Sequence, residues 1–355
     1  MARPDITIMG AGIFGLSIAW AATQRGAKVR VIEARAIGAG SSGGPVGSLA
    51  PHVPDAWNAK KAFQLESLLM AENWWQAVSD ASNLPTGYGR TGRLQPLLDL
   101  QAVDMARARQ IEAQTLWQGQ AAWQVVPALG AAWQPKSPSG WLVHDTLTAR
   151  LNPVQALAAL GVAILAKGGE IIIGNTPPEG PTLWATGADG VADLSAHHMQ
   201  PLGTAVKGQA LLLRYDARNQ PQLFVDGVHI VPHANGTVAI GSTSEIVWSD
   251  PQSTDAQLDT LYQKAILACP DLADAPILTR WAGLRPRTKS RAPMLGPWPN
   301  RPGHFIANGG FKIGFGMAPK VAEVMSDLVL NGHDAIPPKF RVEASLRAEP
   351  PFIMS

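Results

Sequence analysis

The chain of 355 residues has one cysteine, three tyrosines and no apolar run that could cross a bilayer. Its single cysteine, Cys269, excludes an intramolecular disulfide framework and any metal site built from several cysteines, so we predict no metal. A lone cysteine also fits the reducing cytoplasm, where we expect the protein to reside. The apolar segment 154–166 is too short for a membrane span, and we predict no integral membrane segment.

An excess of charge of either sign is also missing. Lysine and arginine number 29 against 27 aspartates and glutamates, and the basic residues form no run. A nucleic-acid partner is therefore not expected. The hydrophobic content of 46% is ample for a large core, which argues against a disordered chain, and the length favours two domains.

The first 33 residues have the pattern of a nucleotide-binding unit. A short apolar strand at 6–9 runs into Gly10-Ala-Gly-Ile-Phe-Gly15, a helix is expected to Gln24, and a second strand covers 28–33. In such a turn the first glycine permits the bend, the second admits a pyrophosphate and the third lets helix and strand pack closely. Glu33 ends the second strand, where a carboxylate accepts hydrogen bonds from a ribose diol. The motif alone fits FAD or NAD equally.

The remaining pattern predicts an α/β layer, then antiparallel strands, then a return to the first layer. Residues 38–47 are glycine-rich and predicted to form a loop, and 83–140 are expected to be irregular apart from a helix near 99–115. Other helices are expected at 62–80, 153–167, 258–268 and 319–330. Strands are expected at 170–173, 209–215, 227–232, 237–242 and 277–285, and the segment 183–188 is expected to be a strand that runs into a glycine turn.

Six segments resemble the FAD-dependent D-amino-acid oxidase superfamily, most closely its glycine oxidase and sarcosine oxidase-like branch. They occur in the family's order and span most of the chain. The segments are ITIMGAGIFGLSIAWAATQRGAKVRVIEA at 6–34, GAGSSGGPVGSLAPH at 38–52, KGQALLL at 207–213, HIVPHANGTVAIGSTSE at 229–245, WAGLRPRTKSRAPMLGP at 281–297 and ANGGFKIGFGMAP at 307–319.

The resemblance implies an α/β chain (α+β overall), in which a Rossmann-type FAD-binding domain is interleaved with an antiparallel β-sheet substrate domain. We expect residues 1–82, 141–200 and 296–345 in the first domain, and 83–140 and 201–295 in the second. Relatives carry a β-meander before their Ala-Thr-Gly turn. Here only 174–183 is available for it, so we expect a loop.

The resemblance further implies FAD that is bound non-covalently, because covalent links in relatives use a Cys or His and Cys269 lies outside the six segments. Ser41 and Ser42 would act as hydroxyl donors. The cofactor-binding residues that we expect are Gly10, Gly12, Ile13, Phe14, Gly15, Glu33, Ala34, Arg35, Ser41, Ser42, Gly43, Gly44, Ala185, Thr186, Gly187, Gly310, Lys312, Ile313 and Gly314.

The substrate residues that we expect are Arg285, Lys312 and His229. Arg285 matches the family arginine that grips the substrate carboxylate, and its planar fork suits that group; a structural ion pair is the alternative. Lys312 stands where glycine oxidases have arginine, and keeps the charge without the fork. His229 stands where relatives have a tyrosine, and His233 where they have an arginine. His229 either faces the substrate or is an ordinary half-buried histidine.

The activity that follows from the resemblance is oxidation of an amino acid or related amine to the imine, by hydride transfer to flavin N5. D-amino acids, glycine and N-methyl amino acids are candidate small-molecule substrates, O₂ or a quinone is the acceptor, and a homo-oligomer is possible. Two alternatives stay open: a non-catalytic flavin-binding subunit, and a tailoring oxidase acting on an aminomethyl group of a modified tRNA nucleoside. A nicotinamide-linked dehydrogenase would leave 38–47 and 307–319 without a role.

Tryptophan is abundant, with 12 residues, and several fall between positions 60 and 140. They would line a substrate pocket, form a partner surface or fill the core, and we favour the core. The residues concerned are Trp74, Trp75, Trp117, Trp123 and Trp133.

Overall fold

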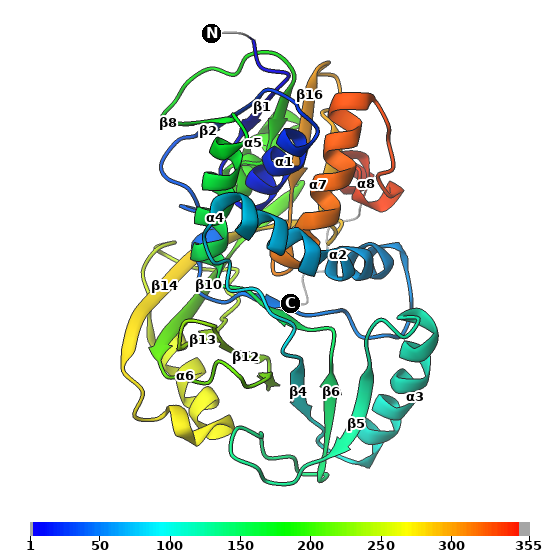
Figure 1. Cartoon of the computed structure of the whole chain (residues 1–355), viewed down its shortest axis with the longest axis vertical. Coiled ribbons are helices and arrows are strands. Elements are labelled where there is room, and N and C mark those ends of the chain that lie inside the picture. The colour runs from blue at the N-terminus through cyan, green and yellow to red at the C-terminus, as the bar shows by residue number, and fades with distance from the viewer. Residues whose placement is uncertain (1–2, 348–355) are drawn as a thin grey trace.

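Two large β-sheets form the frame of the computed structural model, which describes residues 3–347 (Figure 1). The first sheet has six strands, which pair in parallel except for the antiparallel β15–β16 pair. Their spatial order is β15 (Met294–Pro297), β16 (His304–Asn308), β9 (Thr182–Trp184), β1 (Ile6–Met9), β2 (Val29–Glu33) and β8 (Glu170–Ile173).

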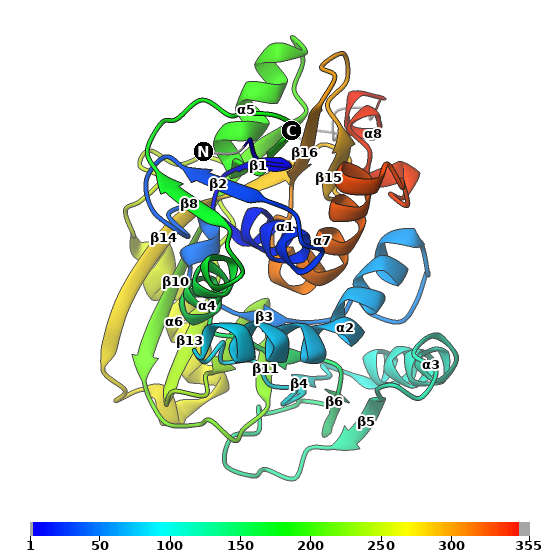
Figure 2. The same ribbon diagram turned by 45° about the horizontal axis from the view of Figure 1, so that its top comes forward.

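Burial on both faces of β1 fits its central position in the sheet. Ile6 and Ile8 are fully buried, as is Thr7, whose hydroxyl donates a hydrogen bond to the Glu179 carbonyl oxygen. Helices α1 (Ile13–Gln24), α4 (Pro153–Ala166) and α7 (Gly314–Asn331) pack beside this sheet, and α2 (Ala59–Ser82) contacts both α4 and α7 (Figure 2).

The second sheet has eight strands and pairs antiparallel except between β11 and β4. Helix α6 (Ala256–Ala268) contacts its β10, β12 and β13, while α3 (Leu100–Leu116) contacts β5. The spatial order is β14 (Ile277–Thr288), β10 (Gly203–Arg214), β13 (Thr237–Gly241), β12 (Val228–Pro232), β11 (Gln222–Val225), β4 (Arg93–Pro96), β6 (Trp141–Asp145) and β5 (Trp123–Pro127).

The long strands β10 and β14 connect the two parts of the molecule. Figure 1 shows them running side by side from the lower sheet up toward the first one. Helix α5 (Gly187–His197) contacts both strands and also β16 of the first sheet. The short strands β3 (Ser48–Leu49) and β7 (Ala149–Arg150) form a separate pair, and α8 (Val342–Arg347) packs against β15.

The mixed α/β architecture expected from the sequence is confirmed, and so is the loop between β8 and β9, where 174–181 contain no helix or strand. The exact domain limits stay a prediction. The tryptophans of the 60–140 region belong to the core: Trp75, Trp117 and Trp123 are buried in the main cluster, against which Trp74 packs, and Trp133 is buried in a second cluster.

Three local predictions were wrong. The last long helix starts at Gly314 rather than Pro319; Pro319 lies inside the helix, where it removes one backbone hydrogen bond without ending the helix. The segment 183–188 does run from a strand, which ends at Trp184, into a turn at Gly187, but that glycine begins α5, a helix that was not predicted. The 83–140 region is more regular than expected, since it contributes β4 and β5 to the sheet.

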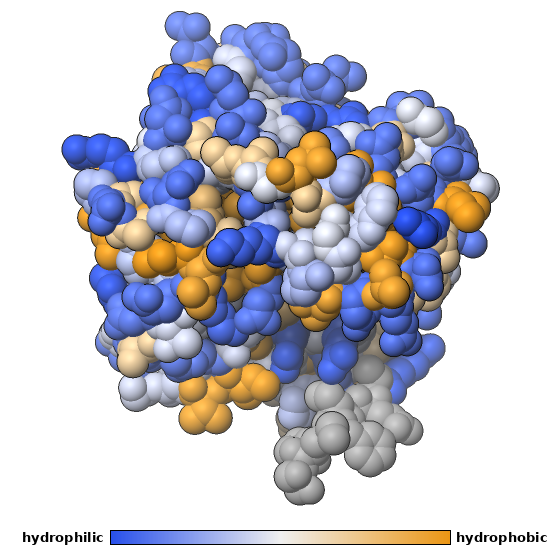
Figure 3. Space-filling model, turned by 90° about the horizontal axis from the view of Figure 1, so that it is seen from below, coloured by the Kyte–Doolittle hydropathy of each residue, from blue (hydrophilic) through white to orange (hydrophobic). Residues whose placement is uncertain are grey.

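Among the described residues, no helix is long and apolar enough to cross a membrane. Large hydrophobic side chains are nevertheless exposed, and Figure 3 shows several of them, in orange, among hydrophilic residues on the face viewed from below. Such scattered exposure is ordinary for a globular protein.

Candidate active site

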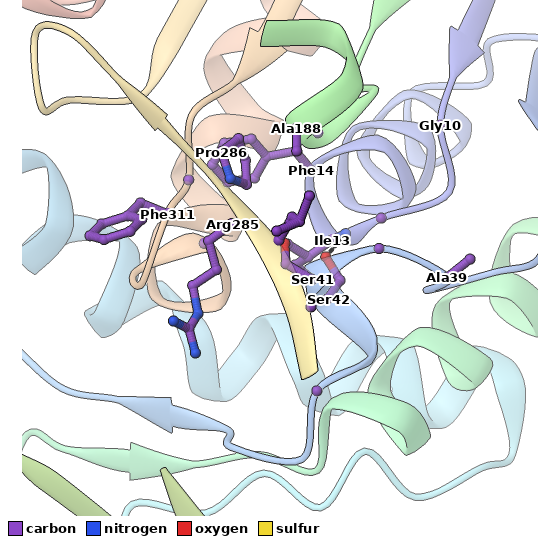
Figure 4. A pocket seen from close by; sticks show the side chains of 18 of the residues that line it. Gly10, Ile13, Phe14, Ala39, Ser41, Ser42, Ala188, Arg285, Pro286 and Phe311 are labelled. Carbon is purple, nitrogen blue, oxygen red and sulfur yellow. Dashed lines mark hydrogen bonds between the residues drawn. The ribbon is translucent and has the colours of Figure 1, made fainter. Parts of the chain in front are cut away.

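A cavity of about 1010 Å³ lies where the two sheets meet. The start of α1, the end of β2 and the loop 39–48 line one part of it, and β14 and the segment 307–315 line another (Figure 4). This volume is at the upper end of the roughly 300–1,000 Å³ that small-molecule sites occupy, so the cavity can take a large cofactor together with a small substrate.

The glycine turn leaves no room for side chains at the bottom of the cavity. Gly10 has φ +105°, and a Cβ atom there would lie 2.5 Å from the carbonyl oxygen of Ala185. Glu33 fixes the turn, because its Oε2 accepts a hydrogen bond from the Ala11 N–H at 2.9 Å. Ser42 Oγ accepts from the Ile13 N–H at 3.1 Å. The result is a rigid surface made of backbone.

Three helices begin at this cavity, and their N-termini direct backbone N–H groups and helix dipoles toward it. The N-cap residues of α1, α5 and α7 are Gly12, Thr186 and Ile313, and none of them accepts a side-chain hydrogen bond from its helix. Free N–H groups and helix dipoles at such ends favour bound anions. The donor set therefore fits the pyrophosphate of a dinucleotide.

Most of the residues expected at the cofactor line this cavity, and Figure 4 shows Ser41 and Ser42 beside the start of α1. Those that line it are Gly10, Gly12, Ile13, Phe14, Glu33, Ala34, Arg35, Ser41, Ser42, Gly44, Ala185, Thr186, Gly187, Gly310, Lys312 and Gly314.

Gly15, Gly43 and Ile313 are not among the lining residues. A Cβ atom at Gly15 would overlap the Gly10 carbonyl oxygen, and one at Gly43 would overlap that of Gly38, so both glycines serve close backbone packing. The Ile313 side chain packs against the main core cluster.

Arg285 supplies a buried charge to the wall formed by β14. It is 8% exposed, and its Nη1 donates a hydrogen bond to the Thr243 carbonyl oxygen at 3.1 Å. Burial lowers the pKa of the guanidinium to about 10, and the nearby carboxylate of Glu245 acts in the opposite direction. Arg285 therefore stays protonated at neutral pH.

Lys312 and His229 line the same cavity as Arg285, as the sequence predicts. Burial and the charge of Arg285 both lower the pKa of Lys312. Burial, Arg93 and Lys312 lower the pKa of His229 to about 3, so its imidazole is neutral. Among the described residues, the buried His229 Nδ1 has no hydrogen-bond partner.

His233 does not line the cavity. It is buried, with its Nδ1 3.2 Å from Thr237 Oγ1 and 3.4 Å from Asn152 Nδ2. The replacement of the relatives' arginine by His233 therefore affects packing rather than the wall of the cavity.

Several lining residues were not predicted from the sequence. Phe224 on β11, Phe311 and Trp281 are the large ones, and the Phe224 ring lies 4.5 Å from that of His229. Strand alternation could have identified Trp281, because it stands four residues before Arg285 and shares its face of β14. Phe224 lies outside the six resembling segments.

Comparison with known proteins decides the family. The family model described as FAD dependent oxidoreductase matches residues 5–328, which is most of the chain. The chain belongs to this family. FAD is therefore its cofactor, in agreement with the anion-binding backbone of the cavity.

Three relatives illustrate the likeness. The bifunctional protein ThiO/ThiG of Nostoc sp. is 30% identical over 351 residues, which is 92% of this chain and 52% of that protein. The chain thus spans about half the length of that curated relative. Glycine oxidase of Geobacillus kaustophilus is 24% identical over 353 residues, or 92% of this chain and 93% of its own. The third, L-proline dehydrogenase from P. horikoshii, is a solved structure whose likeness to this chain is one of fold.

Solved structures support the fold. The crystal structure of the Geobacillus kaustophilus glycine oxidase superposes with a TM-score of 0.83 at 22% identity, covering 96% of this chain and 99% of that one. The L-proline dehydrogenase structure has a TM-score of 0.81 at 20% identity, covering 98% and 99%.

We predict that Gly10→Ala lowers FAD affinity by about tenfold or more. The positive φ costs alanine about 1–2 kcal/mol, and the methyl group also meets the Ala185 carbonyl oxygen. The ratio of FAD to protein after purification, and FAD titration of the apoprotein, measure this effect. Gly161→Ala on α4 is the control, since its methyl group meets only Ile37 and Ile171 side chains outside the cavity. Equal FAD affinity in both variants would contradict the assigned role of the glycine turn.

Proposed function

We propose that the chain oxidises an α-amino acid, or a related amine that carries a carboxylate, to the imine. Glycine, D-amino acids and N-methyl amino acids are the substrates in question. The observation that carries the proposal is a buried, protonated Arg285 beside a cavity that also holds the glycine turn of the cofactor site.

Arg285 has hydrogen-bond donors available for a carboxylate. A guanidinium has five N–H donors, and among the described residues Arg285 uses Nη1 alone, toward the Thr243 carbonyl oxygen. Figure 4 shows the side chain extended from β14 with its guanidinium end free of the other labelled residues. Two parallel hydrogen bonds from this fork would fix both the position and the rotation of a bound amino acid.

The surroundings of Arg285 suit the rest of such a substrate. Lys312 adds a second positive charge, which attracts the carboxylate with looser geometry. The neutral His229 lines the cavity beside this charge, and Phe224 and Phe311 provide apolar surface for the carbon atoms of the substrate. FAD, when bound, supplies the two-electron oxidising power of the reaction. The protein's part is to orient the substrate and exclude water.

The relatives' names support the same reaction class, since glycine oxidase and L-proline dehydrogenase both act on amino acids by name. The final electron acceptor is O₂ or a quinone, and reoxidation of the reduced protein in aerated buffer separates the two. Cytoplasmic location, non-covalent attachment of FAD and a homo-oligomeric state stay predictions.

We predict that Arg285→Ala weakens the binding of acetate by roughly 2–5 kcal/mol, because one partner of a buried charge pair is lost. Perturbation of the flavin absorbance on titration with acetate measures the dissociation constant. Arg285→Lys keeps the charge without the fork, and an intermediate loss is expected. Arg25→Ala removes a partly exposed pair with Asp327, near the C-terminal ends of α1 and α7 and away from the cavity, and serves as the control. Unchanged acetate affinity in Arg285→Ala would refute the proposal.

The pH dependence of kcat/KM should reflect deprotonation of the substrate amine rather than of His229. A histidine with a pKa of about 3 is already neutral from about pH 5 upward, so it contributes no change of charge there. We expect kcat/KM to rise with pH as the amine deprotonates, and His229→Gln to lower kcat/KM without changing the shape of the profile. If the variant instead loses one limb of a bell-shaped profile, His229 acts as a base.

A further inference from the structure

A buried polar network supports the Arg285 guanidinium. The Thr243 carbonyl oxygen accepts from Arg285 Nη1, and the Thr243 hydroxyl donates in turn to Glu245 Oε1. Glu245 is 6% exposed, and it is the carboxylate whose charge opposes the effect of burial on Arg285. A buried carboxylate of this kind needs charge partners of its own.

The opposite charge is Lys207 on β10, which Glu245 shares with Asp255, the N-cap residue of α6. Gln209 Nε2 donates to Glu245 Oε1 and to Asp255 Oδ1, both at 2.9 Å. The Lys207 ammonium lies 3.8 Å from Glu245 Oε2 and 4.0 Å from Asp255 Oδ2. Lys207 is only 2% exposed, so two opposite charges are buried next to each other behind the substrate wall.

The backbone holds this network in register with Arg285. Lys207 and Glu245 exchange two backbone hydrogen bonds of 2.9 Å, and β10 pairs directly with the strand that carries Arg285. Gly208, next to Lys207, lies under the guanidinium, and a Cβ atom there would overlap it. The Arg285 side chain therefore packs across β10, which restricts its conformations.

We propose that Glu245 is a positioning residue for Arg285, and that its buried charge restricts the site to substrates with a single carboxylate. This inference rests on the proposed function and adds the substrate class. Arg285, Lys207 and Lys312 carry three positive charges, against the two negative charges of Glu245 and Asp255. One substrate carboxylate neutralises the group, and a second would be buried without a partner.

Two charged groups beside His229 and Phe311 do not alter this balance. Arg93 and Asp145 form a buried ion pair with an N–O distance of 3.0 Å, which adds no net charge beside His229. Arg287 lies over the Phe311 ring but is partly exposed and does not line the cavity, so water screens its charge.

The test compares acetate with malonate, which differ by one carboxylate, in titrations of the FAD-loaded protein followed by flavin absorbance. Glu245→Gln removes a negative charge near the site, so it strengthens the binding of a dianion more than that of a monoanion. We expect the ratio of the acetate Kd to the malonate Kd to rise roughly tenfold. A purely structural role for Glu245 would weaken both anions equally and leave the ratio unchanged.

Charge-balanced variants keep the inference testable if Glu245→Gln folds poorly. Lys207→Met should lower the ratio of the acetate Kd to the malonate Kd. The double variant Lys207→Met/Glu245→Gln should return this ratio to the wild-type value. Asp255→Asn should raise the ratio by less than Glu245→Gln, because the Asp255 side chain is 47% exposed. Asp327→Asn, in the remote pair with Arg25, should leave it unchanged.

These experiments distinguish a failure of this inference from a failure of the proposed function. If wild-type protein binds both anions through Arg285 but the ratio does not respond to Glu245→Gln, or the double variant does not restore it, the inference is wrong and the proposed function stands. If Arg285→Ala binds acetate as wild-type protein does, the proposed function itself fails.

Discussion

The Arg285 guanidinium keeps its charge in a place from which water is largely excluded, and the substrate part of the cavity depends on this. Burial alone would favour loss of the proton, and the Glu245 carboxylate opposes that effect. The pairing of β10 with β14 places both groups, since Gly208 lies beneath the guanidinium and Lys207 lies beside Glu245. A charge fixed in this way can orient a carboxylate without first reorganising.

The cofactor part of the cavity follows a different principle, because backbone rather than side chains supplies its donors. The N-termini of α1, α5 and α7 meet there, and at Gly10 the turn leaves no room for a side chain. Helix ends favour phosphate without any buried cationic side chain. On the proposed function, FAD and substrate are therefore held by separate means: backbone N–H groups for the cofactor, and the Arg285 side chain for the substrate carboxylate.

Much of this could be predicted from the sequence where the signal is local. The strand, glycine turn, helix and Glu33 follow one another within 33 residues, and the family resemblance added Arg285 and Lys312. Features set by distant pairing were missed. The strand β4 depends on partners from β6 and β11, and Glu245 has its role only because Lys207 and Gln209 lie opposite it across the sheet.

Anaerobic mixing of the FAD-loaded protein with matched pairs of compounds tests the central claim most directly. Each pair consists of an amino acid and the amine that remains when its carboxylate is removed, such as glycine and methylamine, or D-alanine and ethylamine. The account predicts loss of flavin absorbance with at least one amino acid, and reduction slower by about a hundredfold or more with its decarboxylated partner, in line with a loss of roughly 3 kcal/mol of binding. Equal reduction rates within every pair, or no reduction by any amino acid, would contradict it.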